Sequence, residues 1–364
     1  MLRTACLLAL IATPALADLR VASFNAALNR QGPGLLLQDI ESGEDAQIAA
    51  VIAVIVETQP DILLINELDW DAEGRALAAF QVALKEAGAD YPHSFSAPSN
   101  TGVPTDLDVN GDGRLNDPDD AHGYGSFPGQ YGMALLSKYP IDAEGARTFQ
   151  LLTWQESGFA MPEDHYADEV AEILRLSSKS HWDVPVETSL GPLHILAAHP
   201  TPPVFDGPED ANGLRNAAEV GLWARYLSGD SLTDDAGDTA PMADAPFVIL
   251  GDYNLDPKDG DGRSEVMAEL LAHPKLQDPA PTSAGGKAAG QGGANDAHET
   301  DPALDTADWN DDAPGNMRVD YALPSADLTV SDAGVFWPAD GPMAETAATA
   351  SDHRLVWVDL ATPE

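Results

Sequence analysis

The chain is poor in cysteine and in basic residues. Cys6 is the single cysteine in 364 residues, so no intramolecular disulfide can form, and stability must come from a large core or from bound ions. Only 18 Lys and Arg stand against 60 Asp and Glu, for a formal charge of −42. Such a surface repels polyanions and offers no basic run for a nucleic-acid backbone, although a bound metal can supply positive charge locally.

The N-terminus carries an apolar stretch of about a dozen residues, too short to span a bilayer. Residues 1–17, MLRTACLLALIATPALA, combine basic Arg3, this stretch and an Ala-Leu-Ala cleavage signal, which is typical of a secretory signal peptide. We therefore expect export to the periplasm or the extracellular space, without a transmembrane anchor. The mature chain would begin at Asp18, with no thiol and a charge of −43, from 17 basic residues (18 minus Arg3) against 60 acidic ones.

The remaining 347 residues (364 minus 17) contain no repeat and no Pro/Ser-rich linker, which favours a single domain over residues 18–364. We expect an insertion at about 100–128 and a Gly/Asp-rich loop at about 278–317, since neither stretch has helix or strand periodicity. Both could be solvated surface insertions. Trp309 and His298 make it equally reasonable that the second loop borders a functional site.

Apolar runs alternate with helical spacing between them. The expected helices cover 45–58, 72–87, 213–228 and 264–272, and the pattern predicts a sheet core covered by helices. Polar residues at the strand ends should gather at one edge of this core. The predicted strands are 19–25, 61–67, 131–137, 193–199, 247–254, 319–324 and 353–360.

Three short motifs at the ends of these runs carry the chemistry. GDYN (251–254), RVDYAL (318–323) and SDHRLVWVDL (351–360) combine carboxylates, an amide and an imidazole. Such a set is suited to holding a divalent cation and activating a water molecule, which predicts a metal-dependent phosphoester hydrolase. The residues that the motifs supply are Asp252, Asn254, Asp320, Asp352 and His353.

Together with VASFN (21–25) and LLINELDW (63–70), these motifs resemble the endonuclease/exonuclease/phosphatase superfamily, which includes DNase I, exonuclease III, bacterial sphingomyelinases and inositol-polyphosphate 5-phosphatases. The resemblance spans residues 19–360 in the expected order. It implies an α/β (α+β) fold of the DNase I type, a four-layered sandwich of two packed, mostly antiparallel sheets flanked by helices. It also implies an active site at one sheet edge that uses Mg²⁺ or Mn²⁺.

Site residues follow from the resemblance. Glu67 resembles the principal metal-binding carboxylate, and Asn25 resembles the amide that orients metal and phosphate; the alternative for Glu67 is a cap on the following helix. Asp352 would face the metal or the attacking water. Some relatives carry a second acid two residues after the first-strand Asn, where this chain has Ala27, so a second metal ion is less expected.

The catalytic assignments place Asp252 on the attacking water and Asn254 on the phosphoryl oxygens. Asp320 resembles the partner that orients His353, whose charged ring contacts the phosphate.

His199 resembles the second histidine of DNase I-like and sphingomyelinase-like members, a general acid for the leaving oxygen; the alternative is a structural histidine beside two prolines. Lys179 and His181 lie where the superfamily often binds phosphate.

A separate motif, DVNGDGRLNDPD (108–119), fits the 12-residue calcium-loop template. It resembles one dockerin repeat and predicts a structural Ca²⁺ site, the alternative being a solvated Asp/Gly-rich loop. A weaker candidate, DPKDGDG (256–262), lacks a closing acid. The predicted Ca²⁺ ligands are Asp108, Asn110, Asp112, the carbonyl of Arg114, and Asp119.

The sequence thus predicts a secreted phosphodiesterase or nuclease, monomeric and without an evident protein partner, that hydrolyses nucleic acid, a nucleotide or a small phosphoester. A phosphatase or phospholipase-type enzyme acting on inositol phosphates or lipids is the first alternative. A non-catalytic calcium-dependent binding module is the second.

Overall fold

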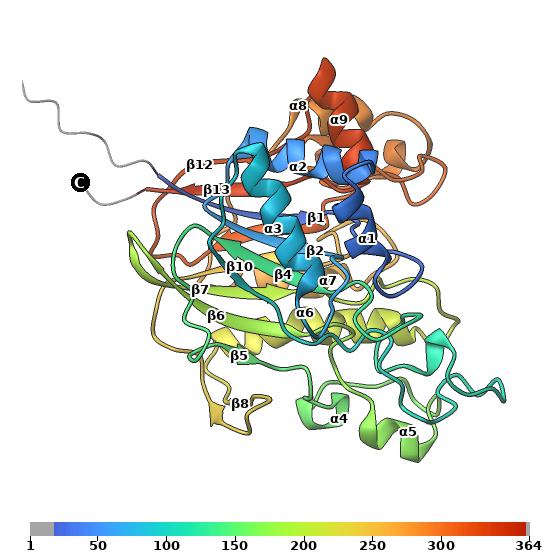
Figure 1. The fold of residues 1–364 in the computed structure, drawn as a ribbon. Coiled ribbons are helices and arrows are strands. Elements are labelled where there is room, and N and C mark those ends of the chain that lie inside the picture. The colour runs from blue at the N-terminus through green and yellow to red at the C-terminus, as the bar shows by residue number, and fades with distance from the viewer. Residues whose placement is uncertain (1–17, 362–364) are drawn as a thin grey trace, which may run out of the picture.

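The computed structural model describes residues 18–361, so the predicted signal peptide lies outside the described residues. Two sheets are stacked face to face, and helices cover their outer faces (Figure 1). Within the described residues, no helix is long and apolar enough to cross a membrane.

The first sheet has six strands in the order β12-β13-β1-β2-β4-β3. Strands β1 and β2 run parallel, and the other neighbours are antiparallel. The bounds are Leu19–Asn25 (β1), Ile62–Asn66 (β2), His93–Phe95 (β3), Met133–Ser137 (β4), Val330–Val335 (β12) and Val356–Leu360 (β13).

The second sheet has five strands in the order β11-β10-β7-β6-β5, in which β7 and β10 are the parallel pair. A small hairpin, β8 (Leu232–Thr233) and β9 (Thr239–Ala240), stands apart. The five strands are Arg147–Thr148 (β5), His181–Thr188 (β6), Gly191–Ala198 (β7), Phe247–Asp252 (β10) and Asp320–Pro324 (β11).

Helices α1 (Leu35–Ser42), α2 (Ala46–Thr58), α3 (Arg75–Ala87) and α9 (Pro342–Ala350) lie over the first sheet, and α6 (Ala211–Leu227) and α7 (Ser264–Leu271) lie over the second (Figure 1). The connections hold shorter helices. These are α4 (Trp154–Ser157), α5 (Asp168–Ile173), α8 (Ala284–Ala289), and 3₁₀ turns at Pro118–Asp120, Gly293–Ala297 and Pro302–Leu304.

The alternation of side chains along each strand produces the layers. In β10, Val248 and Leu250 enter the core between the sheets, whereas Phe247 and Ile249 face the helix layer. Successive strand residues point to opposite faces, so a strand apolar at every position is buried on both sides. This arrangement confirms the predicted four-layered α/β sandwich with two mostly antiparallel sheets.

The four helices expected from periodicity are present as α2, α3, α6 and α7, but the last strand begins at residue 356 rather than 353. His353 instead makes an isolated bridge with Ala307, and its ring contacts Asp320 and Asp252. Strand β6 was not predicted because His181, Asp183 and Pro185 interrupt its apolar pattern, although the strand is buried over most of its length.

Candidate active site

The parallel strand pairs bring the site together, because each ends at the same edge of the sandwich. In the first sheet the ends of β1 and β2 pair Asn25 with Asn66. In the second sheet the end of β10 and the start of β11 pair Asp252 with Asp320. Since the sheets are stacked, polar residues from four strand ends meet there, as is usual for the carboxyl ends of strands in α/β architectures.

Asp252 is the centre of this group and is buried. Its Oδ2 accepts a hydrogen bond from Asn25 Nδ2 at 3.0 Å and lies 3.4 Å from His199 Nε2 and 3.8 Å from His353 Nε2. Its Oδ1 accepts a hydrogen bond from the backbone N–H of Asn254 at 2.8 Å. One carboxylate therefore contacts four of the predicted site residues.

Electrostatics fix the protonation of this group. Burial alone would lower the pKa of His353, but the carboxylates of Asp320 and Asp252 outweigh burial and raise the pKa to about 10. His353 Nδ1 donates to Asp320 Oδ2 at 2.9 Å. Burial would raise the pKa of Asp252, but His353 and His199 hold it well below its usual range. At neutral pH, His353 is therefore an imidazolium between two carboxylates.

Glu67 follows β2 with φ of 62°, a left-handed conformation that costs about 1–2 kcal/mol for a residue with a Cβ. Asn25 Nδ2 donates to its Oε1 at 3.2 Å, and Asn29 Nδ2 donates to its Oε2 at 2.7 Å. A strained, half-buried carboxylate held by two amides fits the ligand of a hard divalent cation.

A second group could hold a metal ion by distance alone. Ligand atoms of Asp252, Asp320 and His353 all lie within 4.8 Å of one another. Without a metal, His353 is an imidazolium with no free lone pair, and its charge compensates the two carboxylates. Glu67 is therefore the better candidate ligand. Asn25 turns its Nδ2 toward Glu67 and its Oδ1 toward the N–H of Ala27, so its direct metal contact stays a prediction.

His199 follows β7 and is buried, with no hydrogen-bond partner for Nδ1 among the described residues. Burial and the nearby Lys179 lower its pKa despite the contact with Asp252. The ring is therefore neutral at pH 7 in the absence of substrate. Its position beside Asp252 agrees with the predicted arrangement, and its role as an acid stays a prediction.

Asn254 has φ of 52°, which turns its side chain back toward the loop after β7. Its Nδ2 donates one hydrogen to the carbonyl of Pro200 at 3.1 Å. An amide nitrogen carries two hydrogens, so one stays available for a phosphoryl oxygen.

Lys179 is buried beside the group, and burial lowers its pKa, while Glu219, Glu67 and Asp252 are the carboxylates that act on it. Glu219 lies on α6 and is fully buried. Its oxygens accept hydrogen bonds from the backbone N–H groups of Ser178 at 2.7 Å and Thr201 at 2.6 Å. The residue thus ties the segment that carries Lys179 to the segment that follows His199.

The phosphate contact predicted for His181 is wrong. The ring is fully buried, Nδ1 is hydrogen-bonded to Ser177 Oγ at 2.6 Å, and Nε2 to the carbonyl of Glu219 at 2.9 Å. Both nitrogens are occupied, so none can reach a phosphate. Because His181 begins β6 with its side chain toward the helix layer, it has a structural role.

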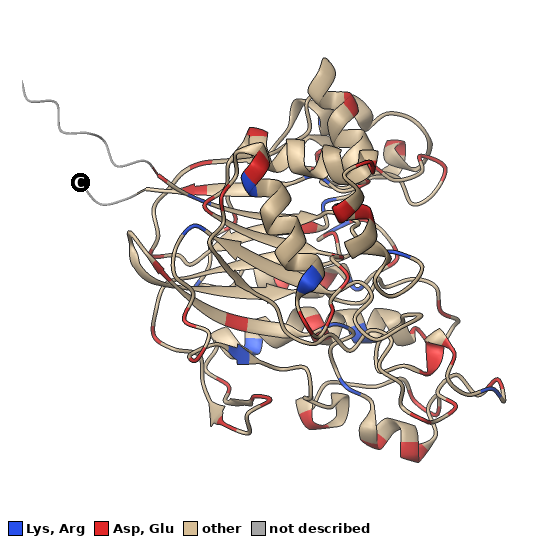
Figure 2. Ribbon diagram, viewed as in Figure 1, with Lys and Arg blue, Asp and Glu red and all other residues tan. Residues whose placement is uncertain are grey.

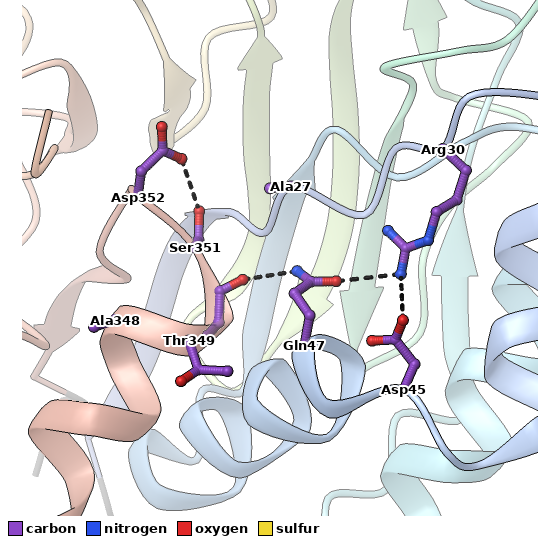
Figure 3. Close-up of a pocket in the computed structure, with 9 residues that line it drawn as sticks. Ala27, Arg30, Asp45, Gln47, Ala348, Thr349, Ser351 and Asp352 are labelled. Carbon is purple, nitrogen blue, oxygen red and sulfur yellow. Dashed lines mark hydrogen bonds and ion pairs between the residues drawn. The ribbon is translucent and has the colours of Figure 1, made fainter. Parts of the chain in front are cut away.

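Asp352 is exposed, on the rim of a hollow of about 300 Å³ between α2 and α9. Figure 3 shows Gln47 between Arg30 and the end of α9, with Asp352 on the opposite side next to Ser351. Gln47 bonds the carbonyl of Ala350 at 2.7 Å and Arg30 at 3.3 Å. In this hollow Arg30 bonds both Asp45 and Gln47, and the proposed metal contact of Asp352 stays a prediction.

Several residues that orient the site are absent from the sequence predictions. Asn66 Oδ1 accepts from the N–H of Asp252 at 3.2 Å and so links the two sheets. Thr306 Oγ1 accepts from the N–H of Asp320 at 2.9 Å. Trp309, by contrast, lies in the loop expected to border a functional site, and its ring packs edge-on against His353 with centroids 5.5 Å apart. Asn66 could have been suggested from the sequence, because it directly precedes Glu67.

The remaining predicted residues, Asp108, Asn110, Asp112, Arg114 and Asp119, lie on a loop that projects from the lower right of Figure 1. They do not join the group around Asp252.

Fold and site together define a hydrolase of the DNase I-like class. The sequence model of the Endonuclease/Exonuclease/phosphatase family matches residues 22–353, and the chain belongs to this family. Its members are phosphoester hydrolases.

Solved structures show the same fold. An endonuclease/exonuclease/phosphatase from Beutenbergia cavernae is 20% identical, with a TM-score of 0.56 over 95% of this chain and 72% of that chain. A family protein from Leptotrichia buccalis is 13% identical, with a TM-score of 0.51 over 94% and 99%. The human Nocturnin catalytic domain is 17% identical, with a TM-score of 0.50 over 96% of each chain. No curated protein matches the sequence.

The charge state of His353 can be tested by NMR on the metal-free protein. We expect its ring signals to stay those of an imidazolium from about pH 6 to pH 8, because both carboxylates hold the proton. The change Asp320→Asn should lower this pKa by about 1 to 3 units, since an opposite charge is removed. A wild-type ring that titrates near its unperturbed value would contradict the assignment.

Proposed function

We propose that the protein is a metal-dependent phosphodiesterase, with nucleic acid or nucleotides as the first substrates to test. The observation that carries the proposal is the contact of Asp252 with two histidines, His199 at 3.4 Å and His353 at 3.8 Å. Diester cleavage needs charge stabilisation on the phosphoryl oxygens and a proton for an alkoxide leaving group. His353 would stabilise the charge on the phosphoryl oxygens, and His199 would supply the proton.

The reaction would be attack of water on phosphorus, with loss of the leaving oxygen on the opposite side. Asp252 is ionised, so its Oδ2 can accept a hydrogen bond from the water and orient it. The His353 imidazolium and the free amide hydrogen of Asn254 would donate to the phosphoryl oxygens as their negative charge grows. Asn25 bridges Asp252 and Glu67 and keeps both carboxylates in place.

Mg²⁺ or a similar ion would be held by Glu67, which Asn25 orients through its hydrogen bond, and would polarise a phosphoryl oxygen and stabilise the leaving oxygen. When protonated, Lys179 would add positive charge close to Glu67 and Asp252. Such local cations matter in this chain, because its formal charge is −42 and the wider surface repels a phosphate.

His199 would give its Nε2 proton to the leaving oxygen. The ring is neutral without substrate, since burial and Lys179 lower its pKa. A bound phosphate brings negative charge next to the ring and favours its protonated form, which makes it a competent acid in the complex.

Small phosphoesters form the second candidate class. Figure 2 shows acidic residues on loops and helices throughout the ribbon, with far fewer basic ones. A small inositol or sugar phosphate, or a lipid headgroup, needs no extended basic track, so this surface favours a phosphatase or phospholipase-type activity more than processive contact with nucleic acid. We also propose export of the mature enzyme to the periplasm or beyond, on the basis of residues 1–17.

Loss of Asp252 or His353 should nearly abolish turnover. We expect Asp252→Asn and His353→Ala each to lower kcat/KM for bis(p-nitrophenyl) phosphate by about 100-fold or more, because each removes a charged group at the reacting phosphate. Glu187→Gln, an exposed carboxylate on β6, is the control and should leave kcat/KM unchanged. Activity near wild type in both variants would overturn the assignment.

Substrates with different leaving groups can test whether His199 acts as the general acid. With dinucleotide substrates, whose leaving alkoxide needs a proton, His199→Ala should lower kcat by about 100-fold or more. With p-nitrophenyl esters, whose leaving phenolate needs none, the loss should be much smaller. Equal losses on both substrates, measured side by side, would mean that His199 does not act as the acid.

A further inference from the structure

The projecting loop at residues 108–119 has the internal bonding of a cation-binding loop. Asp108 accepts hydrogen bonds from the backbone N–H groups of Asp112 at 3.0 Å and Gly113 at 2.9 Å. Gly113 has φ of 84°, so the sharp turn at the sixth position is present. The side chains of positions 1, 3 and 5 therefore fold over the same turn, as the 12-residue template requires.

Several carboxylates lie along this loop with little compensating charge, although no three of them bring their oxygens within 4.8 Å of one another in the described residues. The carboxylates of Asp117, Asp120 and Asp112 are all close enough to Asp119 for their charges to act on it. Arg114 pairs with one of them: its Nε lies 3.9 Å from Asp112, on a side chain that is 80% exposed. An exposed pair at that distance contributes little, so the negative charge is largely uncompensated.

Asp120 provides an independent indication of a ligand. It is 1% exposed, and its Oδ1 accepts a hydrogen bond from the N–H of Val109 at 2.8 Å, which turns the carboxylate toward the loop. Its Oδ2 is buried and has no hydrogen-bond partner. Leaving a carboxylate oxygen unpaired in the interior is unfavourable, and a cation, or a water bound to a cation, would offset this cost.

We propose that residues 108–120 bind one Ca²⁺ ion and that this ion stabilises the segment beside the active site. Asp108, Asn110, Asp112 and Asp119 supply side-chain oxygens, and Arg114 supplies its carbonyl. Asp120 lies behind them and binds directly or through a water. Six or more oxygen ligands on a flexible loop suit Ca²⁺ better than Mg²⁺, which requires a near-ideal octahedron and dehydrates reluctantly.

The ion would act on the rest of the structure through the base of the loop, where Thr105 and Asp120 form a bracket of two hydrogen bonds. The N–H and Oγ1 of Thr105 both donate to the carbonyl of Asp120, at 3.1 and 2.6 Å, and close the loop. On one side of this bracket, Asn100 donates its N–H to the carbonyl of Lys179 at 2.9 Å. On the other side, the N–H of Tyr131 donates to Asp69 Oδ1 at 3.3 Å, two residues from Glu67. An ordered loop would therefore hold both flanks against the site.

Calcium binding can be measured by calorimetry on the full mature chain with the change Glu67→Gln, which suppresses the proposed active-site metal position. We expect one Ca²⁺ per chain, with a Kd of about 10⁻⁵ to 10⁻³ M, as in sensor and extracellular loops. Asp108→Asn and Asp112→Asn should each weaken binding at least about tenfold. Asp106→Asn, an exposed acid just outside the loop, is the matched control and should bind as the parent does.

Absence of binding at millimolar CaCl₂, or equal binding by the parent and both loop variants, would overturn the proposal. Hydrogen exchange provides the second measurement and shows whether each variant folds. Ca²⁺ should slow exchange over residues 100–131 in the parent and not in Asp112→Asn, while the strands of both sheets stay protected in each. Calcium that binds without protecting this segment would overturn its stabilising role.

Discussion

The site depends on one buried arrangement of charge: an imidazolium between two carboxylates. Asp252 and Asp320 are opposite residues on neighbouring strands and are both buried, so they would repel strongly in an interior that screens charge poorly. His353 compensates them, with Nδ1 at 2.9 Å from Asp320 and Nε2 at 3.8 Å from Asp252. Removing one member of such a group leaves a buried charge uncompensated, which makes the three residues interdependent.

The rest of the site is arranged around this group by hydrogen bonds between the two sheets. Asn25 and Asn66 come from the first sheet and bond Asp252 on the second, through its side chain and its backbone N–H respectively. Ser351 Oγ donates to the carbonyl of Asn25 and accepts from the N–H of His353. The positions of the site residues therefore depend on how the two sheets are aligned. The rigid sandwich would hold in place the donors that a reacting phosphate needs.

The local sequence predicts which residues lie at the strand ends, but it predicts few of the residues that hold them in position. Asp252 and Asp320 each adjoin an apolar run, so their position at a strand end follows from the pattern. The environment of Glu219 could not be predicted, because the residue lies on a helix and bonds Ser178 and Thr201, 41 and 18 residues away. His181 is a residue that the sequence predicted wrongly. Its place near Lys179 suggested a phosphate contact, but it lies on β6, a strand whose apolar pattern is interrupted by Asp183 and Pro185, and its side chain is buried in the core.

In the proposed function, cations at defined places would reconcile the strongly acidic surface with phosphate chemistry. These would be His353, Lys179 and a metal ion at Glu67. Diester hydrolysis with and without EDTA tests this account most directly. EDTA should abolish activity, added Mg²⁺ should restore it in the wild type, and Asn29→Ala, which removes the 2.7 Å bond to Glu67, should need about 10 to 100 times more Mg²⁺. Activity that resists EDTA, or an unchanged Mg²⁺ requirement in the variant, would contradict the account.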